Sequence, residues 1–377
     1  MQDQYVPLKL QYLCSLKEAM ALKSDKILAH QNQSICMGSP EPPLMGFYEN
    51  LVRNSNGVMA PEEEMLPEDF VLVDEYCELP IIDVSRLNGG EFDVEECKRE
   101  IVKASEEWGF FQVVNHGIPG EILDRMRSEQ VRVFEKPFEV KEKEEGLPFK
   151  SGSYRWGTKT AKYPSQLSWI EAFHVPMTSF QNLDDHTNLS STMVQFATTV
   201  SELARKFVEI LAENMGQNTT FFEKNCLPST CYIRMNRYPP CPVAPEMFGL
   251  VKHTDSDFLT ILHQDQIGGL QLYKDGKWMA VKPNQETLVI NIGDLFQAWS
   301  NGVYKSVEHR VVTNNQVQRF STAYFVCPFD ETKIQSCIEP SIYRTFSFGE
   351  FRKQVSKDVQ NLGKKIGLPR FLVSTES

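Results

Sequence analysis

The chain has 377 residues, of which 41% are hydrophobic, so it can bury a sizeable core but is short for three domains. Its 50 acidic and 39 basic side chains give a net charge of −11, which repels phosphate backbones and argues against nucleic-acid partners. No stretch approaches 18 apolar residues, no secretory leader is evident, and the nine cysteines form no CxxC pair. We therefore expect a cytoplasmic monomer with free thiols and no membrane association.

Residues 1–70 differ from the rest and are expected to form a partly mobile N-terminal extension. Loop-forming stretches rich in proline and glutamate occur at 38–43 and 61–64. Two interpretations stay open here. Either Met37 is an alternative start and the first 36 residues are dispensable, or residues 8–23 form a short helix that packs on the body.

Residues 71–225 are expected to form an α/β region. The pattern predicts strands at 79–84 and 109–117, and helices at 93–107, 119–136 and 190–215. In the last helix apolar residues recur at steps of three and four, with Ser190 or Ser191 as its N-cap and Gly216 at its end. That pattern favours a structural brace behind a sheet.

From residue 226 to 340 the pattern changes to short strands rich in β-branched residues. The expected strands are Cys231–Tyr238, Phe258–His263, Gly269–Tyr273, Trp278–Lys282, Thr287–Ile292, Ser306–Thr313 and Phe320–Pro328. Asp275 and Gly276 indicate a hairpin turn between two of them. Seven strands at this spacing predict a mainly β fold with flanking helices, built on an antiparallel jelly roll. Residues 341–377 are expected to form a C-terminal helical segment.

Three residues of the β region are candidate metal ligands. His253 and Asp255 lie two residues apart, and on an extended strand both side chains would point to the same face. His309 follows on the expected strand 306–313. Two imidazoles and one carboxylate on one face of an octahedral ion leave the opposite face open, which is the arrangement of non-haem iron(II) oxygenases.

Residues on the neighbouring expected strands could hold a carboxylate beside that metal. Arg319 and Ser321 again lie two residues apart, and an arginine fork with a serine hydroxyl matches a carboxylate. Upstream, the segment Asn236–Pro242 reads NRYPPCP, and strand alternation places Arg234, Asn236 and Tyr238 on one face.

Each motif alone is weak, because an HxD pair is common by chance and a buried arginine more often forms a structural ion pair. The ordered set is strong. Of the other histidines, His116 is expected to support a turn, His263 to lie in the core or beside the site, and His174 to lie in a polar stretch without a role. Two alternatives are a zinc hydrolase, which leaves Arg319 and Ser321 unexplained, and a ligand-binding protein with an inactive site.

The chain resembles the plant soluble 2-oxoglutarate- and iron(II)-dependent dioxygenases from Leu79 to Leu372, including the block Trp108–Gly117. Within them it is most similar to the gibberellin 2-oxidases that act on twenty-carbon gibberellins. Three stretches carry that closer resemblance: Gly152–Thr158, Leu167–His174 and Val251–Thr260.

The resemblance implies a distorted double-stranded β-helix with helices on its outside. It implies that the histidine–aspartate–histidine set binds Fe(II), that Arg319 and Ser321 grip the distal carboxylate of 2-oxoglutarate, that Tyr238 makes a further contact, and that Asn236 lies near the metal-bound end. Dioxygen is then the third cofactor, with ascorbate as a reductant.

The resemblance further implies 2β-hydroxylation of gibberellins, with twenty-carbon precursors preferred, which inactivates the hormone. A rigid apolar polycycle with carboxylates needs an apolar pocket and a cationic anchor. Arg234 is the first candidate for that anchor, because strand alternation aims it into the same cavity as Asn236, and Arg155 is the second. The alternative is the same chemistry on another plant metabolite, such as a flavonoid or a different hormone.

Overall fold

The computed structural model describes residues 42–54, 76–144, 146–149, 151–180, 188–243 and 247–373. Residues 43–377 form one compact unit, and all the described helices and strands belong to it. The expected helix at 8–23 and the alternative start at Met37 lie outside the described residues. The division of the chain at residues 70, 225 and 340 stays a prediction.

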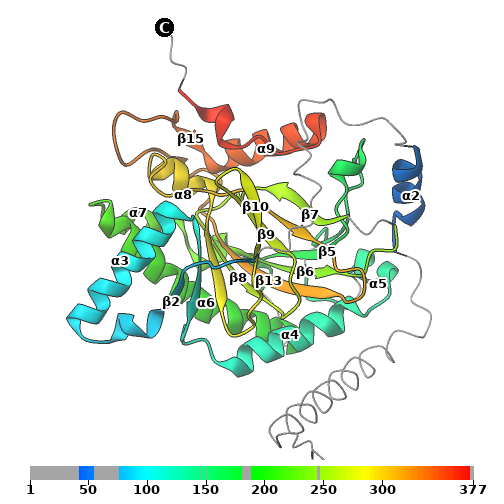
Figure 1. The fold of residues 1–377 in the computed structure, drawn as a ribbon, viewed down its shortest axis with the longest axis horizontal. Coiled ribbons are helices and arrows are strands. Elements are labelled where there is room, and N and C mark those ends of the chain that lie inside the picture. Colours follow the sequence, from blue (N-terminus) through cyan, green and yellow to red (C-terminus); the bar gives the residue numbers. More distant parts are fainter. Residues whose placement is uncertain are drawn as a thin grey trace, which may run out of the picture. The chain divides into compact units, whose positions relative to one another are not determined.

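Two β-sheets lie at the centre of this unit (Figure 1). The larger sheet has eight strands in the order β2 (Ile81–Asp83), β3 (Phe110–Val114), β11 (Leu288–Ile292), β8 (Leu259–Gln264), β13 (Arg319–Val326), β6 (Tyr232–Tyr238), β5 (Glu171–Pro176) and β4 (Tyr154–Trp156). The smaller sheet has the order β1 (Tyr76–Cys77), β10 (Lys277–Val281), β9 (Leu270–Lys274), β12 (His309–Val312) and β7 (Phe248–His253). A separate pair joins β14 (Lys333–Ile334) to β15 (Phe346–Ser347). Neighbouring strands are antiparallel except in the pairs β2–β3 and β1–β10.

Helices flank the sheets. They are α2 (Met45–Asn54), α3 (Glu91–Glu107), α4 (Gly120–Phe134), α5 (Phe138–Lys143), α6 (Asn188–Asn214), α7 (Thr220–Asn225), α8 (Asp294–Trp299) and α9 (Phe348–Leu362). Short 3₁₀ helices are η2 (Val84–Asn88), η3 (Pro164–Gln166), η4 (Met177–Phe180), η5 (Pro228–Thr230) and η6 (Leu368–Phe371). A mainly β fold with flanking helices was predicted, and this arrangement agrees with it.

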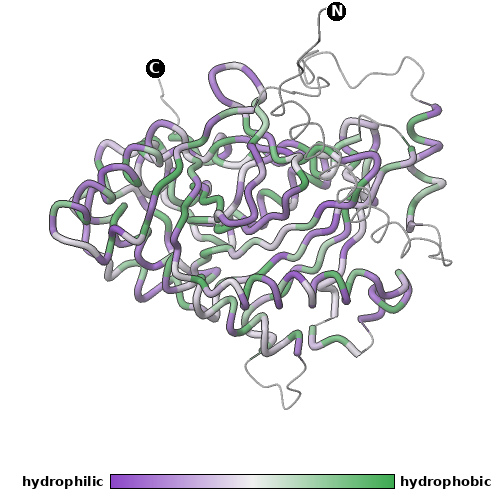
Figure 2. Tube along the Cα trace, turned by 60° about the horizontal axis from the view of Figure 1, so that its bottom comes forward, coloured by the Kyte–Doolittle hydropathy of each residue, from purple (hydrophilic) through white to green (hydrophobic). Residues whose placement is uncertain are grey.

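Helix α6 is the brace that its periodicity predicts. It contacts α3, α4 and the strands β8 and β13. Phe207 on its buried face is 0% exposed, and its ring meets that of Phe111 on β3 edge-to-face at 5.8 Å. Hydrophobic residues of α6 and of the strands that it covers belong to one core cluster, and such residues are green in Figure 2. The helix begins at Asn188, so both expected N-cap serines lie inside it, whereas Gly216 follows its end in the left-handed conformation (φ +68°).

Three features of the fold differ from the expectation. The spacing argument assumed one extended strand for His253 and Asp255, but β7 ends at His253, and Asp255 lies in the loop that precedes β8. Strands β4 and β5 at the edge of the larger sheet were not expected, because β4 has only three residues and the six residues of β5 show no regular alternation of buried and exposed side chains. The strand expected from residue 306 begins only at His309.

Candidate active site

His253, Asp255 and His309 come together at one end of the smaller sheet. His253 closes β7 and pairs across the ladder with His309, which opens β12, so their rings lie 4.3 Å apart between centroids. The loop after β7 then turns Asp255 toward both rings. Its Oδ1 lies 3.7 Å from His253 Nε2 and 3.8 Å from His309 Nε2. One donor atom from each residue lies within 4.8 Å of the others, and in the described part of the chain no other group of three or more His, Cys, Asp or Glu residues does so.

Backbone hydrogen bonds hold both imidazoles in the orientation that a metal needs. His253 Nδ1 lies 2.9 Å from the carbonyl of Val251, and His309 Nδ1 lies 3.2 Å from that of Val307. A proton on each Nδ1 leaves the Nε2 lone pair free and aimed at the shared centre. Burial, followed by repulsion from His309, lowers the pKa of His253 to about 3, so its ring is neutral at physiological pH.

Asp255 is only 8% exposed and uses its second oxygen to anchor itself. Its Oδ2 accepts hydrogen bonds from Thr260 Oγ1 at 2.7 Å and Asn291 Nδ2 at 2.8 Å. Burial alone would raise the pKa of Asp255, but the neighbouring imidazoles and these two hydrogen bonds outweigh it and lower the pKa to about 2. The carboxylate is therefore ionised and presents Oδ1 to the two histidines.

A second polar cluster lies on the adjoining strands of the larger sheet. The register of β13 against β6 pairs Arg319 with Tyr238 and Ser321 with Asn236, so all four side chains share one face. The Arg319 guanidinium lies 5.0 Å from the Tyr238 ring centroid, and Asn236 Nδ2 donates to Ser321 Oγ at 3.3 Å. On β8, Gln264 accepts from Arg319 Nη2 at 2.8 Å.

The same face continues toward Asp255 as a stack of aromatic rings. Phe325 is opposite Thr260 in the ladder and stacks on Tyr232 at 4.4 Å, with 9° between the ring planes. The ring of His174 on β5 covers Tyr232 at 4.0 Å. We call these three rings the aromatic platform.

Both arginines chosen from the sequence lie on the platform's face. Arg234 pairs with His174 across the ladder and donates from Nε to Asn236 Oδ1 at 2.9 Å. Arg155 pairs with Ala172 on β5, which shares that face, and is exposed. Burial, then Arg234 and Arg155, lowers the pKa of His174 to about 4, so the ring is neutral beside these cations.

Comparison with known proteins identifies the family. Residues 229–328 match the model of the 2OG-Fe(II) oxygenase superfamily, and residues 79–192 match that of the non-haem dioxygenase in morphine synthesis N-terminal region. The chain is 57% identical over 335 residues to gibberellin 2-beta-dioxygenase 8 of Arabidopsis thaliana, covering 88% of this chain and 98% of that protein. The chain belongs to the gibberellin 2-beta-dioxygenase family of 2OG-Fe(II) oxygenases.

Further relatives agree with this family. Gibberellin 2-beta-dioxygenase 6 of Oryza sativa subsp. japonica is 46% identical over 347 residues, covering 88% of this chain and 96% of the relative. The solved structure of JOX2 in complex with 2OG, Fe and JA has a TM-score of 0.67 at 26% identity, with 90% of this chain and all of that chain covered. The solved structure of the rice dioxygenase for auxin oxidation has a TM-score of 0.64 at 27% identity, with 78% of this chain and all of that chain covered.

The two sheets therefore form the double-stranded β-helix core of this superfamily, and the predicted fold class is confirmed. The protein is an Fe(II)/2-oxoglutarate-dependent dioxygenase with Fe(II), 2-oxoglutarate and dioxygen as cofactors, and the predicted enzyme class is confirmed as well. This result sets aside the zinc hydrolase and the inactive ligand-binding protein.

The residues present fit these cofactors. Two imidazole nitrogens and one carboxylate oxygen form the donor set of non-haem iron(II) oxygenases, which leaves positions for other ligands. Arg319 is 1% exposed, and its Nε and Nη1 are buried without a hydrogen-bond partner among the described residues. Buried, unpaired guanidinium donors of this kind are expected where a carboxylate binds.

Several residues near the site were missed by the sequence analysis. Asn291 is the polar residue in the otherwise apolar strand Leu288–Ile292, and that contrast could have singled it out. Thr260 could be recognised only once it was known which face of β8 turns toward Asp255. His174 was expected to lie without a role, because β5 was not recognised as a strand.

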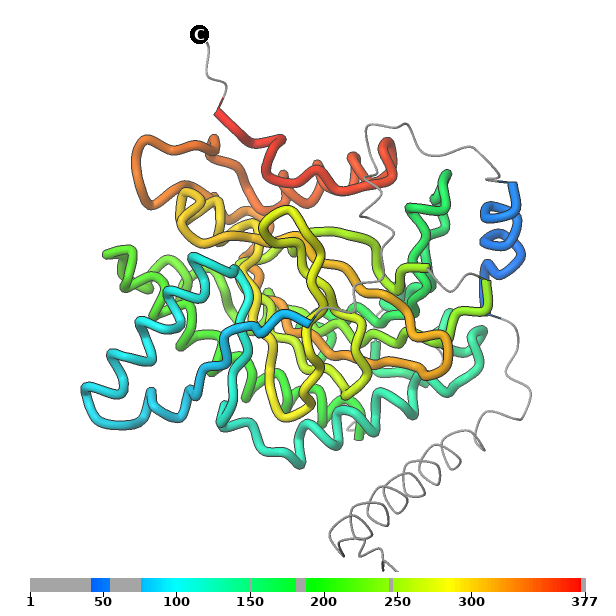
Figure 3. Tube along the Cα trace, in the orientation of Figure 1, coloured from blue at the N-terminus to red at the C-terminus, as the bar shows by residue number. Residues whose placement is uncertain are grey.

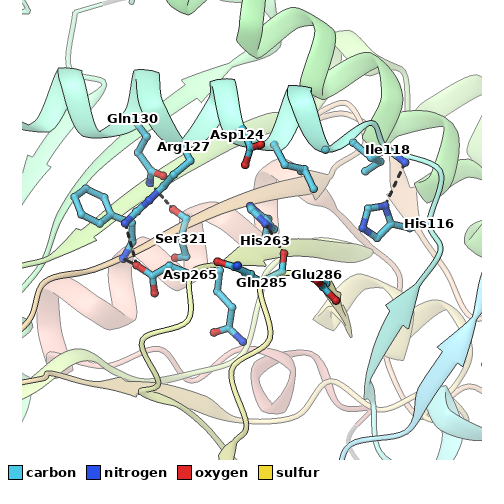
Figure 4. A pocket seen from close by; sticks show the side chains of 14 residues that line it. His116, Ile118, Asp124, Arg127, Gln130, His263, Asp265, Gln285, Glu286 and Ser321 are labelled. Atoms are coloured by element: carbon cyan, nitrogen blue, oxygen red, sulfur yellow. Dashed lines mark hydrogen bonds and ion pairs between the residues drawn. The ribbon is translucent and has the colours of Figure 1, made fainter. Parts of the chain in front are cut away.

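A cavity of about 360 Å³ lies on the other face of the larger sheet, beneath α4 (Figure 4). His263 lines it, because side chains alternate along β8 and His263 therefore faces away from Thr260 and Gln264. His263 therefore does not lie beside the metal site. It is half-buried on the helix-covered face of the sheet, which also carries the core residue Ile261. His116 also lines the cavity, and its Nδ1 accepts from the backbone N–H of Ile118 at 3.2 Å, which supports the turn as expected.

Across the described residues, no helix is both long and apolar enough to span a bilayer.

Proposed function

We propose that the protein hydroxylates gibberellins at the 2β position, with twenty-carbon precursors preferred over nineteen-carbon hormones. The observation that carries the proposal is the 57% identity to an Arabidopsis gibberellin 2-beta-dioxygenase over nearly the whole of both chains. The twenty-carbon preference rests on the resemblance of the stretches 152–158, 167–174 and 251–260 to the group that acts on such precursors.

In this proposal His253, Asp255 and His309 hold the iron. Their support is the short distance between the donor atoms and the backbone hydrogen bonds that free both Nε2 lone pairs. When bound, the iron and 2-oxoglutarate activate dioxygen so that one oxygen atom enters a C–H bond of the substrate and the keto acid becomes succinate and carbon dioxide. Protein side chains supply position and a water-poor pocket.

Arg319 and Ser321 bind the distal carboxylate of 2-oxoglutarate, with Tyr238 and Asn236 beside it. Gln264 and Thr260 share one face of β8 and stand four residues apart, which at about 3.3 Å per residue is roughly 13 Å. Gln264 contacts Arg319, and Thr260 contacts the ligand Asp255. Arg319 and the candidate ligand Asp255 thus contact the two ends of one strand face, and a five-carbon diacid with a carboxylate at each end would lie between them.

The aromatic platform and the two arginines form the substrate side of the site. A gibberellin presents an apolar polycyclic face and carboxylates, which suit stacked rings beside cations. Arg234 is the stronger anchor, because it is half-buried and bonded to Asn236, whereas Arg155 is exposed and lies farther along the same face. Phe325 lies opposite Thr260, which donates a hydrogen bond to Asp255, so this surface extends toward the metal ligands, where a C–H bond must lie to react.

A direct competition tests the substrate. Equal amounts of a twenty-carbon and a nineteen-carbon gibberellin are incubated with the enzyme, Fe(II) and 2-oxoglutarate, and the products are identified by mass spectrometry, with Asp255→Ala as the blank. We expect hydroxylated product first from the twenty-carbon compound. Preferred turnover of the nineteen-carbon hormone would refute the size preference. Succinate release with a flavonoid or another hormone, and with neither gibberellin, would refute the substrate.

A further inference from the structure

The loop that carries Asp255 is held by elements far away in sequence. Residues 254–258 lie between β7 and β8 and take no part in either strand. The start of α8 donates backbone hydrogen bonds to this loop, from Asp294 N to the Asp255 carbonyl and from Leu295 N to the Asp257 carbonyl, each at 2.9 Å. The position of Asp255 therefore depends on contacts from outside its own strand.

Lys365, beyond the end of α9, makes further contacts with this loop. Its Nζ donates to the Thr254 carbonyl and to Ser256 Oγ, both at 2.8 Å, and forms an ion pair with Asp294 Oδ2 at 2.6 Å. Thr254 Oγ1 donates to the same Asp294 oxygen at 3.1 Å. The three N–H donors of the ammonium group are thus matched by three acceptors, and the Lys365 side chain is only 8% exposed.

The chain after α9 is shaped to deliver this lysine. Gly363 ends α9 in the left-handed conformation (φ +75°), and Gly367 adopts φ +72° two residues after Lys365. A Cβ at Gly367 would lie 3.2 Å from Asp294 Oδ2, so the backbone approaches the ion pair closely there. Figure 3 shows the result, with the red C-terminal segment beside the golden α8.

We propose that Lys365 is a positioning residue for the metal centre. Its ammonium group donates hydrogen bonds to Thr254 and Ser256, the residues on both sides of Asp255. The ion pair with Asp294 of α8 holds that ammonium group in place. Because β7 ends at His253, no strand holds Asp255 at a set distance from that histidine, and Lys365 takes over this role. This inference rests on the proposed role of the triad in binding iron.

The expected effect is a loss of metal affinity. Changing residues that orient metal ligands typically weakens binding 10- to 100-fold. Lys365 acts on the backbone beside a ligand and not on the ligand side chain itself, so we expect the lower end, about tenfold. At saturating Fe(II) the Lys365→Met enzyme should regain most of its kcat, and its KM for 2-oxoglutarate should be unchanged because Arg319 is untouched.

The experiment measures Fe(II) binding to anaerobic apo-protein by equilibrium dialysis, alongside the unfolding temperature. Lys365→Met is compared with Lys141→Met, which also breaks a buried lysine–carboxylate pair. Lys141 pairs at 2.6 Å with Glu171, which lies on strand β5 and not in the loop of Asp255. Both variants should lose thermal stability. Only Lys365→Met should lose iron affinity, and Lys365→Arg should recover part of it.

Equal iron affinity in Lys365→Met and Lys141→Met would overturn the proposal, because destabilisation alone would then account for the phenotype. If Lys365→Met does not accumulate as folded protein, Asp294→Asn gives the second test, since it weakens the grip while keeping the side-chain shape. Wild type and Asp255→Ala are dialysed in parallel. Equal binding by these two would instead contradict the assignment of the triad, which separates failure of the function from failure of the positioning role.

Discussion

Asp255 divides its two oxygens between the candidate metal position and the protein. Its Oδ1 faces the histidines and its Oδ2 is fixed by Thr260 and Asn291. None of the three candidate ligands belongs to a hydrophobic core cluster, so loss of one side chain should remove a donor without opening the core. We expect His253→Ala, Asp255→Ala and His309→Ala each to abolish 2-oxoglutarate-dependent succinate release while the circular dichroism spectrum stays native. His263→Ala, on the other face of the sheet, is the matched control. Succinate release near the wild-type rate in any one of the three would remove that residue from the metal site.

Arg319 carries buried donors without a partner among the described residues. Arg319→Ala should leave the co-substrate carboxylate unpaired in a buried slot, at a cost of about 3–5 kcal/mol. That is roughly two to four decades in the affinity for 2-oxoglutarate. Arg319→Lys should recover only part, because an ammonium group lacks the planar fork. Arg237→Ala, which alters the opposite face of β6, controls for loss of an arginine. An unchanged dissociation constant for 2-oxoglutarate in Arg319→Ala would rule out the assigned role.

His174 gives a pH dependence whose sign is set by its environment. Burial and then the neighbouring arginines lower the pKa of folded His174 to about 4, whereas an unfolded histidine titrates near 6.5. Between these values the unfolded chain binds a proton that the folded chain does not, so the contribution of His174 to stability falls as the pH drops from about 6.5 toward 4. His174→Phe should therefore lose less thermal stability than wild type between pH 7 and 5. An equal fall in unfolding temperature between pH 7 and 5 for the two proteins would show that the pKa of His174 is not lowered.

Among the elements, α6 could be predicted almost completely and the loop of Asp255 could not. The long apolar period of α6 is a local signal that survives in the fold. The placement of Asp255 is not local, since it depends on α8 and on Lys365, more than a hundred residues later. The two-residue spacing of His253 and Asp255 correctly suggested a shared site, but for the wrong reason, because the ligands converge through a loop and not along a strand.

Because α6 is a structural brace, we expect changes on its buried face to lower stability and to leave the KM values unchanged. Phe207→Ala removes a fully buried ring that contacts Phe111, which should lower the free energy of unfolding by about 3–5 kcal/mol. The KM values of the folded enzyme should not change. Val194→Ala, at a position of the same helix that is 40% exposed, should cost little. A change in the KM for gibberellin in Phe207→Ala at a temperature where it is folded would contradict a purely structural α6.

Across the molecule, the fold class and the candidate triad followed from a few motifs in a fixed order on short strands. Arg234 was placed correctly by alternation along β6, because the strand is regular. The aromatic platform was not foreseen, since His174, Tyr232 and Phe325 meet only when β5, β6 and β13 are aligned. Contacts that depend on strand register, and not on spacing within one strand, were the ones that a single sequence could not give.

The proposed function requires that conversion of 2-oxoglutarate is coupled to hydroxylation of a gibberellin. Turnover of a twenty-carbon gibberellin under ¹⁸O₂, with succinate and hydroxylated product quantified together by mass spectrometry, measures that coupling. We predict about one succinate per hydroxylated gibberellin, ¹⁸O in the new hydroxyl group, and no product from Asp255→Ala. Succinate formed without hydroxylated gibberellin, or a hydroxyl oxygen taken from water, would contradict the proposed function.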